Sequence, residues 1–337
     1  MPTSDRMAVQ DYYDLTAMGR ARRLRAAVAA ALDHYDLEVT RIRLMTNETN
    51  GVFRIDAADG SKYVVRVGLG GEIGHSRGEV AAETDWLAAL AAETDLTLSR
   101  PVPARDGRRF VTVEAPGVPG PRNVVVFTWL RGVLLDDRLN PATIRAYGAL
   151  SARLHLHGAG HAPADPDALP RYDRVFPFDE PVVLFDESGD LMPDSRREVF
   201  EAARARVDDA VDALLGTGEP MRVLHGDLHV WNVMVSREGL APFDFEDLLW
   251  GWPIQDIAVS LYYLENRPES DERIAGFRAG YEAVAPWPER YHGEMSAFLM
   301  GRFLVLGNDL LITPEWRPVA AKYLGRYEQR LRILLGE

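Results

Sequence analysis

The sequence predicts an α+β fold in two lobes, a β-rich N-terminal lobe with one prominent helix followed by a mainly helical C-terminal lobe. Short runs with strand patterns, separated by turn residues, fill the first 130 residues. Apolar residues at helical spacing dominate the rest of the chain. The 337 residues are 47% hydrophobic, enough for a sizeable core. We expect the lobes to be residues 1–130 and 131–337, with a hinge near residues 127–130.

The N-terminal lobe is expected to contain two helices and two pairs of strands. Apolar residues at near-helical spacing in an arginine- and alanine-rich stretch predict an opening helix over residues 14–34. Ser76 followed by Glu79 fits a capping box, which starts a second helix with an apolar stripe. The expected strands are residues 52–56, 62–67, 109–113 and 124–129.

The C-terminal lobe is expected to be a set of helices interrupted by one long irregular segment. Residues 158–194 are rich in proline and acidic side chains and too long for a plain connector, which favours a partly ordered functional loop. Short strands are expected at residues 222–224, 232–235 and 242–245. The expected helices are residues 141–157, 195–215, 253–264, 270–284, 292–311 and 317–335.

Composition restricts the class of protein and its partners. The chain has no cysteine, which excludes disulfides, thiolate zinc sites and cysteine nucleophiles. A net charge of −13 and a pI near 5.2 argue against nucleic acid or anionic membrane as a partner. The longest apolar runs, Val124–Leu130 and Ala26–Leu32, are too short to cross a bilayer, and the polar start carries no secretory signal. We therefore expect a cytoplasmic monomer or homodimer.

Chemistry is concentrated in residues 225–235, His-Gly-Asp-Leu-His-Val-Trp-Asn-Val-Met-Val, and in residues 241–246, Ala-Pro-Phe-Asp-Phe-Glu. Phosphoryl transfer requires positioning and charge neutralisation more than covalent catalysis. Asp227 could orient or accept the proton of a hydroxyl group. The amide oxygen of Asn232 and the carboxylate of Asp244 are hard oxygen ligands of the kind Mg²⁺ prefers.

The first segment resembles the catalytic loop of the protein-kinase-like superfamily, in which an Asp and an Asn lie five residues apart. Its His-Gly-Asp-Leu-His-x-x-Asn form is similar to the aminoglycoside phosphotransferase branch, alongside homoserine kinase-like and choline kinase-like relatives. The resemblance spans about residues 40–335. It implies a bilobal protein-kinase-like fold, with Asp227 as the catalytic base and Asn232 and Asp244 as metal ligands.

The resemblance also assigns supporting positions after the loop. Glu246 stands where this branch carries an acidic residue in place of the kinase glycine. Asp256 matches an aspartate that braces the catalytic loop, although an acidic residue at a helix N-terminus is stabilising in any case. His229 could approach substrate or phosphate, and a satisfied loop histidine is the alternative.

The N-terminal lobe offers the nucleotide-binding half of the same pattern. Arg66 lies on the strand where kinases place the phosphate-pairing lysine, and Lys62 on the same strand face is a second candidate. Glu83 lies on the apolar face of the following helix, where a carboxylate is costly unless paired, so we expect an Arg66–Glu83 ion pair. Residues 46–51, with Asn50, match the phosphate-covering turn. The hinge residues expected to bind adenine are Phe127, Trp129 and Leu130.

We therefore expect an ATP- and Mg²⁺-dependent phosphotransferase that moves the γ-phosphate to a hydroxyl group of a small molecule, with GTP left open as the nucleotide. A stress-response-type protein Ser/Thr kinase would use the same residues and is an alternative. A metal-dependent hydrolase is an alternative of another class, because His225, Asp227 and His229 alternate along an extended segment and could share one side. The sequence leaves the identity of the acceptor open.

Overall fold

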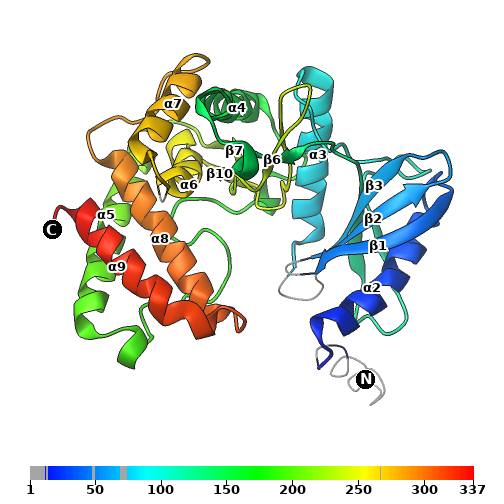
Figure 1. The fold of residues 1–337 in the computed structure, drawn as a ribbon, viewed down its shortest axis with the longest axis horizontal. Coiled ribbons are helices and arrows are strands. Elements are labelled where there is room, and N and C mark those ends of the chain that lie inside the picture. Colours follow the sequence, from blue (N-terminus) through cyan, green and yellow to red (C-terminus); the bar gives the residue numbers. More distant parts are fainter. Residues whose placement is uncertain (1–11, 13, 48–49, 69–73, 266) are drawn as a thin grey trace. The chain divides into compact units, whose positions relative to one another are not determined.

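The computed structural model describes residue 12 and residues 14–47, 50–68, 74–265 and 267–337 (Figure 1). It divides into two compact units. Unit 1 contains Met1–Val133, Pro163–Ala168 and Met234–Glu246, and unit 2 contains Leu134–Ala162, Leu169–Val233 and Asp247–Glu337. Unit 1 is therefore assembled from three stretches of chain, and Asp244 and Glu246 belong to it, whereas the sequence assigns them to the helical lobe.

The fold confirms the predicted α+β class, with an antiparallel sheet in unit 1 and helices in unit 2. The sheet has the order β1-β2-β3-β5-β4. Its strands are β1 (Val39–Asn47), β2 (Gly51–Ala57), β3 (Lys62–Val67), β4 (Val111–Val113) and β5 (Arg122–Thr128). Strand β1 is absent from the sequence-based prediction.

The core of unit 1 lies between this sheet and α2 (Ala17–Leu32). Alternate residues of a strand point to opposite faces, so Val65 and Val67 of β3 enter this core while Arg66 points to the other face. Helix α3 (Arg77–Glu93) meets that other face through Glu83. The predicted capping box is present, because Ser76 Oγ accepts from the Glu79 N–H and the Glu79 carboxylate accepts from the Ser76 N–H.

A second sheet has the order β6-β8-β9, formed by β6 (Val133–Leu134), β8 (Val233–Val235) and β9 (Leu240–Pro242). Strands β8 and β9 form the expected hairpin around residues 237–239. The expected strand at residues 242–245 is wrong in its position, since β9 ends at Pro242. Asp244 instead has a φ of 66°, in the left-handed region, which a strand does not contain.

Unit 2 is built from helices around one short strand pair, β7 (Arg222–Leu224) with β10 (Leu249–Gly251). Helix α4 packs on α7, and α8 packs on α5, α6 and α9. Between α4 and α5 the chain is irregular apart from the short 3-10 helices η3 (Pro166–Ala168) and η4 (Gly189–Leu191). The helices are α4 (Pro141–Gly160), α5 (Asp194–Leu215), α6 (Pro253–Glu265), α7 (Ser270–Glu282), α8 (Glu294–Ile312) and α9 (Ala320–Leu335).

Helix α8 is long and apolar enough, by length and composition alone, to cross a membrane. However, 67% of its most apolar window is buried within the protein. Its side chains Phe298, Phe303 and Leu304 are almost fully buried. These properties are those of a core helix.

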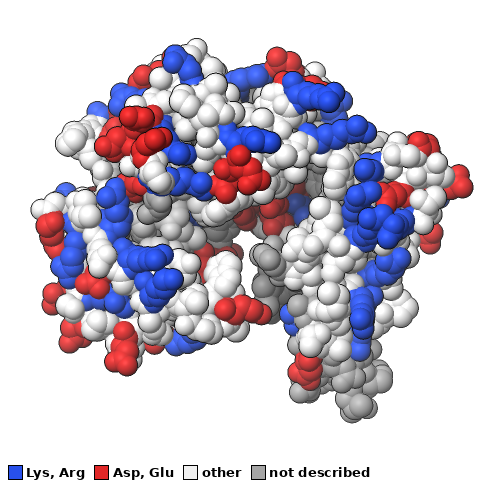
Figure 2. Space-filling view, in the orientation of Figure 1, with Lys and Arg blue, Asp and Glu red and all other residues white. Residues whose placement is uncertain are grey.

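Both signs of charge occur on the surface of each unit. On the face drawn in Figure 2, basic side chains are visible over the strands of unit 1, and acidic and basic side chains are interspersed on unit 2. Exposed basic residues of the first strands and of α2 include Arg22, Arg25, Arg41 and Arg43. The net charge of −13 is thus not expressed as a uniformly acidic face in this view.

Candidate active site

The candidate catalytic loop follows β7 and runs from His225 to Asn232. Gly226 has a φ of 81°, and a Cβ there would lie 1.9 Å from the carbonyl oxygen of Asp247, so only glycine fits. His225 is fully buried, and its Nδ1 accepts a hydrogen bond from the Asp227 N–H at 3.4 Å. The ring of His225 therefore serves the loop's own backbone.

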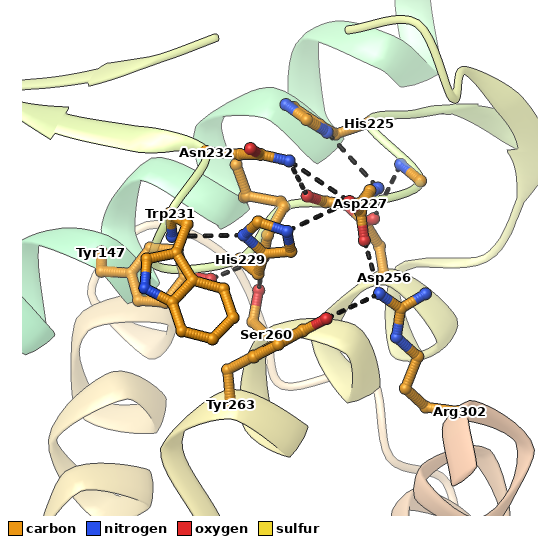
Figure 3. A network of polar contacts seen from close by, with 12 residues as sticks. Tyr147, His225, Asp227, His229, Trp231, Asn232, Asp256, Ser260, Tyr263 and Arg302 are labelled. Atoms are coloured by element: carbon orange, nitrogen blue, oxygen red, sulfur yellow. Dashed lines mark hydrogen bonds and ion pairs between the residues drawn. The ribbon is translucent and has the colours of Figure 1, made fainter. Parts of the chain in front are cut away.

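Asp227 is held by three side chains of unit 2 (Figure 3). The Asn232 amide nitrogen donates to the backbone oxygen of Asp227 at 3.0 Å and to its Oδ2 at 3.2 Å. His229 Nε2 lies 3.2 Å from the same Oδ2. The Trp231 N–H donates to His229 Nδ1 at 3.2 Å, which makes Nδ1 the acceptor and Nε2 the nitrogen that donates to Asp227.

The third partner, Arg302 of α8, is missing from the sequence-based prediction. Its Nη2 donates to Asp227 Oδ1 at 2.6 Å and to the hydroxyl of Tyr263 at 3.1 Å. Burial opposes ionisation of Asp227, but Arg302 and His229 hold the pKa of its carboxyl below the ordinary range. Burial would lower the pKa of Arg302, and Asp227 raises it above its ordinary value. The sequence carries one signal that could have singled out Arg302, since it is a cationic residue inside an apolar helical stretch.

Buried polar groups of α4, α6 and α7 hold the loop in place. Asp256 Oδ1 accepts from the Gly226 N–H at 3.0 Å, and its Oδ2 lies 2.9 Å from Nε2 of His155. His155 Nδ1 in turn lies 3.0 Å from the hydroxyl of Tyr281. These contacts favour the bracing interpretation of Asp256, and His155 is a member of the brace that sequence reasoning missed.

The hydrolase alternative requires His225, Asp227 and His229 to face one metal ion. Both ring nitrogens of His229 are engaged by the loop, Nδ1 by Trp231 and Nε2 by Asp227. No group of three or more His, Cys, Asp or Glu residues that could hold a metal ion occurs among the residues that the structure describes. The geometry gives this alternative no support.

Unit 1 contains the expected Arg66–Glu83 ion pair. Arg66 Nη1 donates to Glu83 Oε1 at 2.8 Å, and Arg66 Nη2 donates to Glu83 Oε2. Glu246 Oε2 lies 3.5 Å from Arg66 Nη1, so the arginine is flanked by two carboxylates. Burial would lower the pKa of Arg66, but Glu83, Glu246 and Asp244 raise it above its ordinary value.

A cavity of about 440 Å³ in unit 1 adjoins this ion pair. Asn50 is buried beside it and donates through Nδ2 to Glu246 Oε2 at 2.5 Å. Residues 48 and 49 of the phosphate-covering turn lie outside the described residues. The polar or charged side chains that line the cavity include Asn50, Arg66, Ser76, Thr112, Asn123 and Glu246.

The expected adenine-binding residues lie at the end of β5 and just after it. Phe127 is buried, with the Arg66 guanidinium 5.5 Å from its ring centroid. Trp129 is half-buried, and its ring lies 5.4 Å from the guanidinium of Arg54. Leu130 is half-buried in the segment that follows β5. Their assignment to the nucleotide remains a prediction.

The residues expected to hold a metal ion belong to different units, Asn232 to unit 2 and Asp244 to unit 1. Their chemistry fits a hard cation. The Asn232 amide nitrogen is turned toward Asp227, and its Oδ1 makes no hydrogen bond within the described residues, so an oxygen ligand remains. Asp244 brings a carboxylate in an uncommon backbone conformation of the kind found at functional segments.

Comparison with known proteins identifies the relatives of this arrangement. Amicoumacin kinase from Bacillus subtilis (strain 168) is 22% identical over 264 residues, which cover 75% of each chain. Among solved structures, amicoumacin kinase hAmiN in complex with AMP-PNP, Ca²⁺ and Ami matches with a TM-score of 0.68 at 18% identity, covering 91% of this chain and 93% of that one. A microcompartment-associated aminopropanol kinase gives 0.71 at 23% identity, covering 92% and 98%.

The structural matches establish the kinase-like fold, and a family model supplies the assignment. The model described as the phosphotransferase enzyme family matches residues 42–293, three quarters of the chain. The matched range contains the candidate catalytic loop, the Arg66–Glu83 pair and the Asp244 segment. The chain belongs to the phosphotransferase enzyme family.

Proposed function

We propose that this protein is an ATP- and Mg²⁺-dependent kinase that transfers the γ-phosphate to a hydroxyl group of a small molecule. The observation that carries the proposal is the environment of Asp227. It is a carboxylate held ionised by Arg302 and His229 with its side chain still 20% exposed, so that a ligand can reach it. A fixed, ionised carboxylate is what an acceptor hydroxyl requires for orientation and for loss of its proton.

On the acceptor side, Asp227 would accept the hydrogen bond of the incoming hydroxyl group. Trp231 would line the space next to it, since its side chain is 44% exposed although its ring packs edge-on against His229 and Tyr263. An exposed aromatic surface beside a catalytic carboxylate suits the ring or carbon skeleton of a small acceptor.

On the donor side, unit 1 would supply Arg66 to the nucleotide phosphates, with Glu83 and Glu246 fixing its guanidinium. Arginine presents its donors in a planar fork, so its phosphate contact differs from that of the lysine usual in relatives. Asn50 would sit at the phosphate-covering turn, and the segment from Phe127 to Leu130 would contact the base. The nucleotide in this proposal is ATP.

Mg²⁺ bound to Asn232 and Asp244 would neutralise charge on the phosphates during transfer. Asn232 would offer its Oδ1 because its amide nitrogen is already bonded to Asp227. Asp256 and His155 would keep in place the loop that carries Asp227 and Asn232.

The relatives favour a small acceptor over a protein. Amicoumacin kinase and the aminopropanol kinase are each named for a small molecule. By this analogy we infer a small hydroxyl compound, and the fold alone does not select among them. We expect the cytoplasm, where ATP is available, as the site of action.

The proposal is tested with a panel of hydroxyl compounds, in which acceptor-stimulated release of ADP is measured with and without Mg²⁺. Asp227→Ala is expected to lower turnover by roughly 10²–10⁴-fold, because it removes the group that orients the hydroxyl. Asp227→Asn keeps the shape without the charge and serves as the matched variant. Binding of AMP-PNP, measured by calorimetry, should survive both substitutions. Full turnover in Asp227→Ala would refute the assignment.

The same panel separates the alternatives. A protein kinase would phosphorylate a protein substrate or itself and ignore the small hydroxyl compounds. A hydrolase would retain stoichiometric zinc and act without a nucleotide. Metal analysis of the purified protein, together with phosphate transfer from radiolabelled ATP, distinguishes the three activities.

A further inference from the structure

Arg302 is a cationic residue beside Asp227 that lies outside the catalytic motif. It lies on α8, 75 residues along the chain from Asp227, and its Nη2 is 2.6 Å from Asp227 Oδ1. The helix around it is apolar, and its neighbours Phe303 and Leu304 are buried. A cation in such a helix is costly unless it is paired, so its position calls for an explanation.

The hydrogen bonds of the Asp227 carboxylate are unevenly divided. Each carboxylate oxygen can accept about two hydrogen bonds. Oδ2 lies within 3.2 Å of two donors, Asn232 Nδ2 and His229 Nε2. Oδ1 has Arg302 as its one donor among the described residues. The free lone pair is therefore on Oδ1, and a hydroxyl group that approaches Asp227 has to bond next to Arg302.

Arg302 is itself held in place. Its Nη2 also donates to the Tyr263 hydroxyl at 3.1 Å, and its guanidinium lies 5.7 Å from the centroid of the Tyr263 ring (Figure 3). The Nε of Arg302 is buried with no hydrogen-bond partner in the part of the chain that the structure describes. The arginine therefore meets Asp227 in a fixed orientation and keeps a donor that no described group uses.

We propose that Arg302 is the acceptor-side positioning residue of this kinase. It fixes the carboxylate of Asp227 so that Oδ1 presents one lone pair to the acceptor hydroxyl, and it places a permanent positive charge beside that hydroxyl. This inference rests on the proposed role of Asp227. A misplacement of about 1 Å at a catalytic group can cost about 10²-fold in rate, so the effect should appear in kcat.

A second ion pair of unit 2 provides a matched control. Arg196 Nε lies 2.9 Å from Glu328 Oε2, and the two side chains are 13% and 19% exposed. The corresponding exposures for Arg302 and Asp227 are 14% and 20%. Arg196→Met therefore removes a similar ion pair from the same unit without touching the catalytic loop.

The experiment compares wild type, Arg302→Met, Arg302→Lys and Arg196→Met with an acceptor identified from the panel. We expect Arg302→Met to lower kcat by about 10²-fold, with the KM for ATP changed by less than about threefold. Arg302→Lys keeps the charge and should recover about tenfold of that loss. Arg196→Met should lower the urea midpoint to a similar extent as Arg302→Met while leaving kcat unchanged.

A second readout does not depend on turnover. Amide hydrogen exchange over residues 226–232 should be at least about tenfold faster in Arg302→Met and unchanged in Arg196→Met. The proposal is overturned if Arg302→Met leaves both kcat and this exchange unchanged, if it raises kcat, or if Arg196→Met has the same effects. A wild type inactive on every acceptor, with exchange still dependent on Arg302, would refute the proposed function and with it the acceptor-side role, and would leave only the ordering of the loop by Arg302.

Discussion

Arg66 is a buried cation of unit 1 with two carboxylates beside it. Its guanidinium and the Glu83 carboxylate have exposures of only 9% and 2%, and Glu246 lies beside them. Removing one member of a buried pair leaves the other charge uncompensated, which costs more than the pair itself contributes. The stability of variants that lack one or both members therefore tests the ion pair without any measurement of activity.

We expect Arg66→Met to lower the free energy of unfolding by about 3–5 kcal/mol, because the Glu83 charge remains buried without its partner. Urea denaturation monitored by tryptophan fluorescence gives the measurement. The double variant Arg66→Met/Glu83→Met should recover a large part of the loss, since the more deeply buried carboxylate is gone and Glu246 keeps its hydrogen bond from Asn50. A double variant less stable than Arg66→Met would show that the pair is not the source of the effect.

Asp309 predicts a pH dependence of stability. It lies on α8, where burial and the neighbouring Glu180 raise its pKa from 3.8 to about 7, with Arg302 acting in the opposite direction. The folded state then binds this proton more tightly than the unfolded state, so the stabilisation is complete below about pH 4 and is lost as the pH rises toward 7. The deprotonated carboxylate is destabilising above that range.

The stabilisation of the protein by Asp309→Asn should therefore grow as the pH rises from 5 to 8, by an amount on the order of 1–3 kcal/mol. Urea midpoints measured between pH 5 and pH 8 test this. Val305→Ala, a neutral change on the same helix, should give a difference that does not vary with pH. A difference for Asp309→Asn that stays constant over the range would contradict the prediction.

Sequence reasoning proposes site residues that lie in a local motif. Asp227, Asn232 and Asp244 lie in two short segments of recognisable spacing, and an unpaired Glu83 on an apolar helix face required a partner. Arg302 and His155 escaped because each reaches the loop from a helix distant along the chain, and no local pattern relates them to it. Such contacts are set by how α4 and α8 pack.

At the scale of elements, two glycines permit the close packing of α4 on α7. A Cβ on Gly148 would lie 1.9 Å from the Phe277 carbonyl oxygen, and a Cβ on Gly280 would lie 1.8 Å from that of Arg145. The backbones approach each other at both points, so neither position can accept a side chain without moving a helix. The contact also holds α4, which carries His155 of the loop brace.

Gly148→Ala is expected to destabilise the protein by about 1–3 kcal/mol, because the overpacking cost exceeds the gain of about 1 kcal/mol in helix propensity. Gly160→Ala, at the end of the same helix with no atom within 4 Å of its added Cβ, is the control and should be neutral or stabilising by up to about 1 kcal/mol. Thermal unfolding of both variants decides the matter. Equal melting temperatures would mean that α4 and α7 can separate at no cost.

Two differences between the predicted and the observed elements have physical causes. Strand β1 has register shifts between Val39 and Arg41 and between Leu44 and Thr46, which break the alternation that marks a strand. The segment around Asp244 was assigned to a strand because its apolar neighbours look like one, whereas a left-handed residue ends that geometry. Long helices, by contrast, agreed with the prediction to within a few residues at their ends because their apolar spacing is repeated over several turns.

Across the whole chain, the binding of nucleotide and metal should raise the free energy of unfolding. Unit 1 contains Asp244 and Arg66, and unit 2 contains Asp227 and Asn232. Any ligand that binds only the folded chain stabilises it by an amount that grows with its concentration relative to Kd. Nucleotide and metal can therefore be separated by their effects on unfolding, with no acceptor present.

We expect AMP-PNP with Mg²⁺ to stabilise the wild type by about 2.7 kcal/mol at a concentration 100 times Kd, and by less when EDTA removes the metal. Asp244→Asn should abolish the difference between the Mg²⁺ and EDTA samples, because the carboxylate proposed to hold the cation is gone, while the metal-independent stabilisation by nucleotide remains. Asp179→Asn removes a carboxylate that is fully exposed and should behave as the wild type. The measurement is the melting temperature across a titration of AMP-PNP. An Asp244→Asn protein that keeps the full Mg²⁺-dependent increment would show that the metal is bound elsewhere, and the donor side of the proposed mechanism would have to be rebuilt around other oxygen ligands.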